Sequence, residues 1–125
     1  MNAPSGAWLR NGISRAGSPF LETEHVVWLQ VDDVYADSRG FAGTTSYDGQ
    51  RVTWLREVGP QEVDSGVLTE RDAGLLETGD GYAELWDLLG GGASGAWAVE
   101  GVRVVRVGNH VVHVDAAGGS HLVLS

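Results

Sequence analysis

The chain has 125 residues, 42% of them hydrophobic, and its 17 acidic against 8 basic side chains give a formal net charge of −9. This charge repels phosphate backbones and anionic lipid surfaces, so nucleic acid and membranes are excluded as partners. The absence of cysteine excludes disulfides, thiolate metal sites and cysteine nucleophiles.

A chain of this length is predicted to form one domain, residues 1–125, with a core large enough to need no cross-links. Residues 1–6 are expected to be a flexible N-terminus. They contain neither a basic region nor an apolar run, so no targeting segment is predicted here. No stretch approaches the roughly 20 apolar residues of a membrane-spanning helix. These features together predict a cytoplasmic protein.

The first half of the chain is predicted to form strands joined by tight turns, as its many glycines indicate. The clearest strand is 25–31, whose two faces are both largely apolar, so one face should meet a core and the other a cover. Asp48 and Gly49 predict a type I′ hairpin turn. The strands expected here are 8–13, 25–31, 34–39, 41–47 and 51–58.

In the second half, shorter strands alternate with glycine-containing turns. For residues 82–88 a helix is the main alternative, since Tyr82, Leu85, Trp86 and Leu89 follow helical spacing. A strand is favoured because the segment lies among hairpins and is opened by a glycine. The strands expected here are 66–70, 75–78, 82–88, 96–99, 102–107, 110–115 and 121–124, with a flexible loop at 90–95.

These elements predict an all-β fold, a single antiparallel up-and-down β-barrel of roughly nine to eleven short strands. Closure removes the two free edges that consecutive hairpins otherwise leave, which favours a barrel over an open sheet, although a sandwich stays open as an alternative. A barrel of about eight or more strands can hold one small ligand.

Several short segments resemble one group of proteins. The segments are Trp8-Leu9-Arg10, Ile13-Ser14, Val27-Trp28-Leu29-Gln30, Tyr35-Ala36-Asp37-Ser38-Arg39 and Phe41-Ala42-Gly43. Over about residues 8–86 the chain resembles small lipocalin-like (calycin-type) β-barrel proteins of largely unassigned function. The resemblance implies a barrel with an internal cavity, and the fold hosts carriers, haem binders and a few cyclases or isomerases.

Three tryptophans each lie two residues from a polar residue within a predicted strand. Residues two apart on a strand share a face, so each pair should project into the same space, as an aromatic cavity with polar groups would require. Alternatively, the tryptophans fill a core and the polar heads reach water at the strand ends. An Arg56–Glu84 ion pair inside the barrel would offset the cost of burying either charge. The pairs are Trp28 with Gln30, Trp54 with Arg56, and Trp86 with Glu84.

A second candidate set is Tyr35, Asp37 and Arg39, on one face of a single strand. Asp37 could orient Arg39, whose planar guanidinium would bind a carboxylate or polarise a carbonyl, while Tyr35 donates a hydrogen bond. The alternative is an exposed polar face with an ordinary Asp–Arg pair.

The histidines give weak support for a metal or haem. His110 and His113 point to opposite strand faces, so only a twisted hairpin that brings His121 near His113 would make a metal site. Haem would need one histidine and an apolar pocket. The Gly90-x-Gly92-x-x-Gly95 string lacks the βαβ context of a dinucleotide site. No cofactor and no metal are therefore predicted.

The prediction from the sequence is that the barrel binds a small, largely apolar metabolite. The predicted ligand-binding residues are Trp28, Gln30, Tyr35, Trp54, Tyr82 and Trp86, with Arg56 and Glu84 orienting the ligand's polar end. The alternative is a cofactor-independent cyclase or isomerase in the same cavity.

In that enzyme, Arg39 or Arg56 would stabilise negative charge, Tyr35 or Tyr82 would donate a hydrogen bond, and Asp37 or Glu84 would move a proton. A third hypothesis is an interaction module, in which the apolar strand at 26–31 forms the surface of a homodimer or partner complex.

Overall fold

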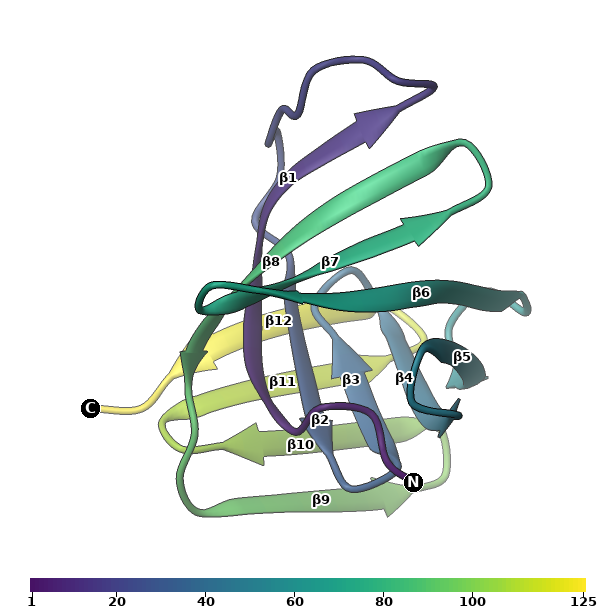
Figure 1. Ribbon diagram of the computed structural model, residues 1–125. Helices are drawn as coiled ribbons and strands as arrows, with labels where there is room; N and C mark the ends of the chain where they lie inside the picture. Colours follow the sequence, from purple (N-terminus) through teal and green to yellow (C-terminus); the bar gives the residue numbers. More distant parts are fainter.

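The protein is entirely built of β-strands, and the first eight form a closed antiparallel barrel (Figure 1). The computed structural model describes residues 1–125. It contains no helix long and apolar enough to cross a membrane. The barrel strands are β1 (Gly6–Arg15), β2 (Val27–Val31), β3 (Val34–Asp37), β4 (Phe41–Tyr47), β5 (Arg51–Val58), β6 (Val63–Arg71), β7 (Gly74–Gly79) and β8 (Tyr82–Gly90).

The last four strands form a second sheet in the order β12-β11-β10-β9. They are β9 (Ser94–Val99), β10 (Val102–Val107), β11 (His110–Asp115) and β12 (Gly118–Val123). The predicted all-β barrel is confirmed, with twelve strands in place of nine to eleven. These four strands lie outside the barrel because β8 pairs with β1 and leaves no free edge for β9.

Strand β8 resolves the helix-or-strand alternative for residues 82–88 in favour of the strand. It pairs with β7 on one side and β1 on the other, so its backbone hydrogen bonds are satisfied by neighbouring strands. The helical spacing of its apolar residues is overridden by this tertiary pairing.

Strand β2 is buried on both faces, as its sequence predicted. Val26, just before it, and Trp28 lie in a core inside the barrel, whereas Val27 and Leu29 lie in a second core outside it. Strands β10 and β11 of the second sheet cover that outer face. The apolar outer face is thus covered within the chain, which corrects the hypothesis that residues 26–31 form a dimer surface.

The second core is made only of aliphatic side chains from both sheets. They interdigitate in a layer between the barrel wall and the second sheet, and an ion pair between Arg103 and Glu57 (3.3 Å) joins the two at the rim. The buried members are Ala7, Val27, Leu29, Ala36, Ala42, Val58, Val105, Val107, Val112 and Val114.

One end of the barrel is closed by the N-terminal segment. Ala3 is 2% exposed and belongs to the inner core, and the Trp8 indole N–H donates to the Pro4 carbonyl at 3.1 Å. Within the segment expected to be flexible, Ala3 and Pro4 are therefore packed, because the buried indole takes its hydrogen-bond acceptor from this stretch, whereas Met1, Asn2 and Ser5 are exposed.

The hairpin at Asp48-Gly49 differs from the expected type I′ turn. Tyr47 pairs with Val52, which makes a longer loop, and only Gly49 of the two turn residues has a positive φ. The Asp48 side chain accepts hydrogen bonds from the backbone N–H groups of Gln50 and Arg51 at 2.9 and 2.7 Å. This side-chain capping stabilises the wider turn.

Replacing Leu29 with alanine is expected to lower the free energy of unfolding by about 2–5 kcal/mol, because it opens a cavity in the second core. Chemical denaturation measures this change. The matched control is Leu122→Ala, at a side chain that is 58% exposed, and it should change stability by less than about 0.5 kcal/mol. Equal losses for the two variants would contradict the packing of the second sheet on β2.

Candidate functional site

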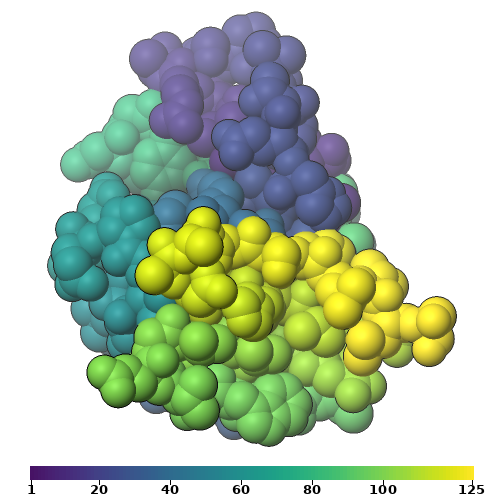
Figure 2. All heavy atoms as spheres, turned by 180° about the vertical axis from the view of Figure 1, so that it is seen from behind, coloured from purple at the N-terminus to yellow at the C-terminus, as the bar shows by residue number.

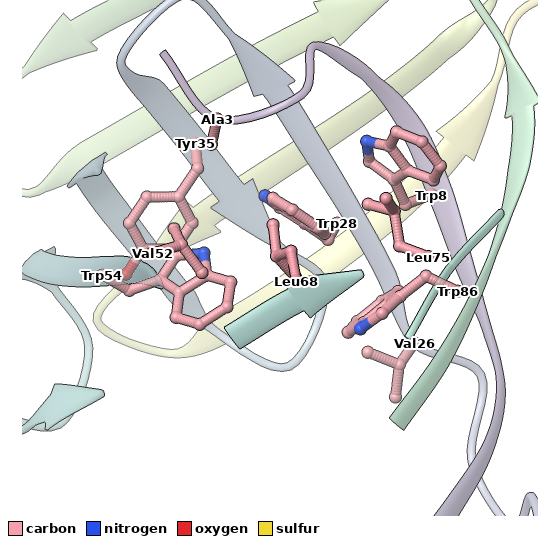
Figure 3. Close-up of a cluster of buried hydrophobic side chains, with 10 residues drawn as sticks. All are labelled: Ala3, Trp8, Val26, Trp28, Tyr35, Val52, Trp54, Leu68, Leu75 and Trp86. Atoms are coloured by element: carbon pink, nitrogen blue, oxygen red, sulfur yellow. The ribbon is translucent and has the colours of Figure 1, made fainter. Parts of the chain in front are cut away.

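Four tryptophans occupy the centre of the barrel (Figure 3). Trp28 lies edge-on to Trp54 and Trp86, with ring centroids 5.6 and 5.5 Å apart, and stacks on Trp8 at 6.1 Å. Trp28, Trp54 and Trp86 all point inward, as predicted. They also pack on one another, so most of the interior is filled by the aromatic rings themselves.

A hollow remains beside these rings at one end of the barrel. The space open to the centre of a water molecule is about 20 Å³, enough for about one or two waters, and the hollow with its open mouth encloses about 310 Å³. Its walls are aromatic on the inner side and charged toward the mouth. The lining residues are Trp28, Tyr35, Asp37, Arg39, Phe41, Trp54, Arg56, Asp64, Glu77 and Trp86.

Two arginines lie on the ring of Phe41 at the mouth. The guanidinium carbons of Arg56 and Arg39 are 3.8 and 5.2 Å from the ring centroid, within cation–π range. Arg39 also forms a two-pronged ion pair with Asp37, with Nε–Oδ1 and Nη2–Oδ2 distances of 3.0 and 2.8 Å. Although burial opposes it, the Asp37 carboxylate raises the pKa of Arg39. The ion pair between Asp37 and Arg39, which both interpretations of these residues included, is present, and Asp37 is buried rather than on an exposed face.

Two hydrogen-bond donors on the wall of the hollow have no partner. They are the Tyr35 hydroxyl and Arg56 Nε, both buried. Arg56 uses its Nη1 for the Pro60 carbonyl (3.1 Å) and for Glu62 (3.2 Å), which leaves Nε free. Burial raises the pKa of Tyr35, so its hydroxyl keeps its proton and can donate. An unpaired buried donor costs about 1–3 kcal/mol, so an acceptor in the hollow, including a water molecule, would stabilise both groups.

Glu77 is a buried carboxyl on the opposite wall, and it is 3% exposed. Burial, with a smaller contribution from Glu84, raises its pKa to about 8, so Glu77 is mainly neutral at pH 7. Its Oε1 accepts the Trp86 indole N–H at 3.1 Å, and its Oε2 lies 2.5 Å from the Tyr82 hydroxyl.

The neutral form of Glu77 also fits the surrounding hydrogen bonds. The Tyr82 hydroxyl lies 3.3 Å from the Ser65 carbonyl as well as 2.5 Å from Glu77. Tyr82 has one proton to donate, so both contacts are satisfied together only when Glu77 donates to Tyr82 and Tyr82 donates to Ser65. The carboxyl proton thus lies in a short chain of hydrogen bonds beside the hollow.

Glu84 and Arg56 do not form the predicted ion pair. Glu84 faces Arg10 at 3.6 Å, and Arg10 makes a two-pronged pair with Glu22 at 2.9 and 3.0 Å. The predicted Arg56–Glu84 pair does not form because the two side chains lie in different places. Arg56, near the mouth, is close to the exposed Glu62, whereas Glu84 is opposite Glu77 on the neighbouring strand. Burial raises the pKa of Glu84, and its Oε2 has no hydrogen-bond partner.

Gln30 and Tyr82 are displaced from the predicted ligand site. Gln30 is fully buried and satisfied: it accepts from Trp28 Nε1 at 3.1 Å and donates to Thr45 Oγ1 and the Asp32 carbonyl, both at 2.8 Å. It is not part of the wall of the hollow. Tyr82 reaches the hollow only through Glu77.

Three histidines form an end-to-end chain outside the barrel. His121 accepts or donates at 3.0 Å to His25 through Nδ1 and to His110 through Nε2. His113 instead lies 3.9 Å from Asp115. Because His121 uses opposite nitrogens, the three rings do not converge on one point, and no group of three or more potential ligands could hold a metal ion. Burial and the two neighbouring imidazoles lower the pKa of His121.

Sequence reasoning did not select Phe41, Asp64 or Glu77. Glu77 lies two residues after the buried Leu75, so strand alternation alone places it on the inner face. Phe41 lies two residues after Arg39, at the start of the next strand. Asp64 lies outside the predicted strand 66–70, whereas the observed strand β6 begins at Val63 and includes it.

Comparison with known proteins does not identify a family for this chain. No protein-family model matches the chain, and no significant match is found among curated proteins or solved structures. The resemblance to lipocalin-like proteins therefore stays a prediction, and the function has to be argued from the site.

Glu77→Gln is expected to remove a pH dependence of stability. The pKa of Glu77 is about 8 in the folded protein and near 4.5 in the unfolded chain, so its contribution to stability is present in full below pH 4.5 and is lost as the pH rises through 8. The melting temperature of the unmodified protein should fall between about pH 6 and about pH 9, by roughly 3–8 °C, and that of Glu77→Gln should fall less.

The matched control is Glu70→Gln, which replaces an exposed glutamate on the adjacent strand β6. It should leave the pH profile unchanged. A profile for Glu77→Gln that follows the unmodified protein over the whole range would show that Glu77 is ionised at neutral pH.

Proposed function

We propose that this protein binds a small molecule that has a compact apolar part and one hydrogen-bond-accepting end, a carbonyl or a carboxylate, in the mouth of the barrel. The observation that supports it best is the pair of unpartnered donors, the Tyr35 hydroxyl and Arg56 Nε, on the wall of an aromatic hollow. The oxygen of the ligand would accept from both donors and remove the cost of leaving them unpaired. Its apolar part would contact Phe41 and Trp54.

The charges around the hollow favour an acceptor that is neutral or negative. Arg39 is balanced by Asp37, whereas the partner of Arg56, Glu62, has a side chain that is 66% exposed to solvent, which weakens the pair. Burial raises the pKa values of Asp64 and Glu77, which reduces the negative charge of the opposite wall. A carboxylate beside Arg56 would therefore meet little repulsion.

The size of the hollow limits the ligand. Ligand pockets are usually about 300–1,000 Å³, whereas the enclosed space of the hollow is only about 20 Å³. The tryptophans fill the deeper interior, so only the acceptor end of the small ligand would enter the hollow, and its apolar part would lie at the mouth. We also propose a cytoplasmic location, because the chain has no cysteine and therefore no disulfide that would need an oxidising compartment.

Titration of tryptophan fluorescence with a panel of aromatic carboxylates and small cyclic ketones tests the proposal. Saturable quenching is expected, and Arg56→Met and Tyr35→Phe should each weaken it at least about tenfold, because each removes one donor. The control is Arg51→Met, an exposed arginine on the same strand, which should leave the affinity unchanged. Absence of saturable binding across the panel, or equal losses for all three variants, would overturn the proposal.

The second candidate is a cofactor-independent isomerase or cyclase at the same site. The observation that favours it is Glu77, whose pKa of about 8 suits a group that gives and takes a proton near neutral pH. Arg56 would stabilise negative charge that develops on the substrate oxygen. Asp37 is held by Arg39 and Glu84 is turned toward Arg10, so Glu77 replaces both as the proposed proton carrier.

Mass spectrometry of each positive mixture separates the two candidates. A binding protein returns its ligand unchanged, whereas an enzyme gives a product. If a product forms, Glu77→Gln should lower its rate at least about a hundredfold while fluorescence binding is kept within a few fold. A rate for Glu77→Gln equal to that of the unmodified protein would exclude Glu77 as the proton carrier.

A further inference from the structure

Strand β9 is an open edge of the second sheet. It pairs with β10 on one side and with no strand on the other, and five of its six residues are exposed. Figure 1 shows β9 as the outermost strand of the second sheet, beyond β10, and in Figure 2 the green and yellow-green residues of this sheet form the lower part of the face in view. A strand edge of this kind presents unpaired N–H and C=O groups to any strand that approaches it.

The sequence of β9 lacks the features that usually protect such an edge. Ser94-Gly95-Ala96-Trp97-Ala98-Val99 contains no charged residue and no proline. Trp97 is 58% and Val99 66% exposed, on the same outer face as Val102 and Val104 of β10. Edges that stay unpaired in natural proteins are usually blocked by lysine, proline or a bulge, so this edge is suited to pairing.

Part of the opposite edge of the sheet, strand β12, is covered within the chain, whereas Leu122 and Val123 at its end are exposed. The backbone of β12 runs against the turn at Ser38 and Gly40 so closely that a Cβ on Gly119 would lie 2.6 Å from the Ser38 carbonyl oxygen. His121 of the same strand is bound to His25. Strand β9, with five of its six residues exposed against four of six in β12, is therefore the more open of the two edges.

The barrel and the second sheet differ in net charge. Residues 90–125 hold two acidic and two basic side chains, Glu100, Asp115, Arg103 and Arg106, so the formal charge of −9 lies entirely on residues 1–89. Two copies that met through their barrels would repel each other, whereas the second sheets are neutral. The charge distribution thus favours association of two copies through the second sheet.

We propose that two copies of this chain pair through β9 in an antiparallel arrangement, which joins their two four-stranded sheets into one sheet of eight. Antiparallel pairing of a strand with itself is compatible with a two-fold axis, the symmetry of most dimers. The outer faces of both sheets then lie on the same side, where the two Trp97 rings are near the axis and cover apolar surface of both copies.

The register of the hairpin indicates which backbone groups form this contact. Val99 and Val102 flank a two-residue turn and exchange hydrogen bonds with each other, so Val99, Trp97 and Gly95 direct their polar groups toward β10. Ala96 and Ala98 direct theirs to the free edge. Proline at Ala96 would therefore remove a donor that only the second copy uses.

Analytical ultracentrifugation of the purified protein over a range of about 1–300 µM tests the proposal, since edge contacts of this size are usually weak. The expected result is a concentration-dependent dimer. Trp97→Lys should raise the dimer dissociation constant at least about tenfold, because it places a charge on each side of the two-fold axis. Ala96→Pro should do the same, and both variants should melt as folded monomers.

Leu122→Lys is the matched control, because Leu122 has the same exposure, 58%, and the same face as Trp97 but lies on the opposite edge strand β12. It should leave the dimer intact. A monomer at every concentration would overturn the proposal, and so would a dimer that survives Ala96→Pro. Dissociation by Leu122→Lys as strong as that by Trp97→Lys would indicate stacking of outer faces and would overturn edge pairing.

Discussion

The structure depends on the burial of β2 on both of its faces. Trp28 and Gln30 point into the barrel and are 1% and 0% exposed, while Val27 and Leu29, both at 0%, point to the layer under the second sheet. One strand is thus the shared wall of two cores. The period-two alternation fixes this arrangement, because a slip by one residue would move Trp28 and Gln30 into an aliphatic layer that cannot satisfy their polar atoms.

The inner core combines close aromatic packing with an unusual number of buried charged groups. The tryptophans fill the centre, and Arg10, Asp37, Glu77 and Glu84 surround them at 3 to 6% exposure. Asp37 is paired with Arg39, and Arg10 with Glu22, but Tyr35, Arg56 and Glu84 keep a polar atom without a partner. A barrel selected only for stability would satisfy or omit such groups, and two of them, Tyr35 and Arg56, line the hollow, which supports the proposed binding site.

Many of the strands could be predicted from local patterns in the sequence. The strands 41–47, 51–58, 102–107 and 110–115 have the predicted bounds, because alternation and flanking glycine turns act over a few residues. The division into a barrel and a second sheet could not be predicted from the sequence. A hairpin has the same sequence pattern whether its strands belong to the barrel or to the second sheet. The division depends on β8 reaching β1, a contact between residues more than sixty positions apart.

For the site, the sequence determined which side chains face inward. The three tryptophan and polar pairs, and Tyr35 with Asp37, were found by spacing alone, since alternation along a strand fixes the face of each residue. The predicted strand 34–39 ends at Asp37, so Arg39 lies in the following turn and is held toward the hollow by its ion pair with Asp37. Only the tertiary structure decided which of them meet: Arg56 with Glu62, Glu84 with Arg10, and Glu77 with Tyr82. The contact between Glu84 and Arg10 joins β8 to β1, so it depends on the stagger and closure of the barrel, which no local pattern encodes. The other two contacts lie across a single connection between neighbouring strands, and they depend on the length and course of that connection, which the alternation pattern does not give.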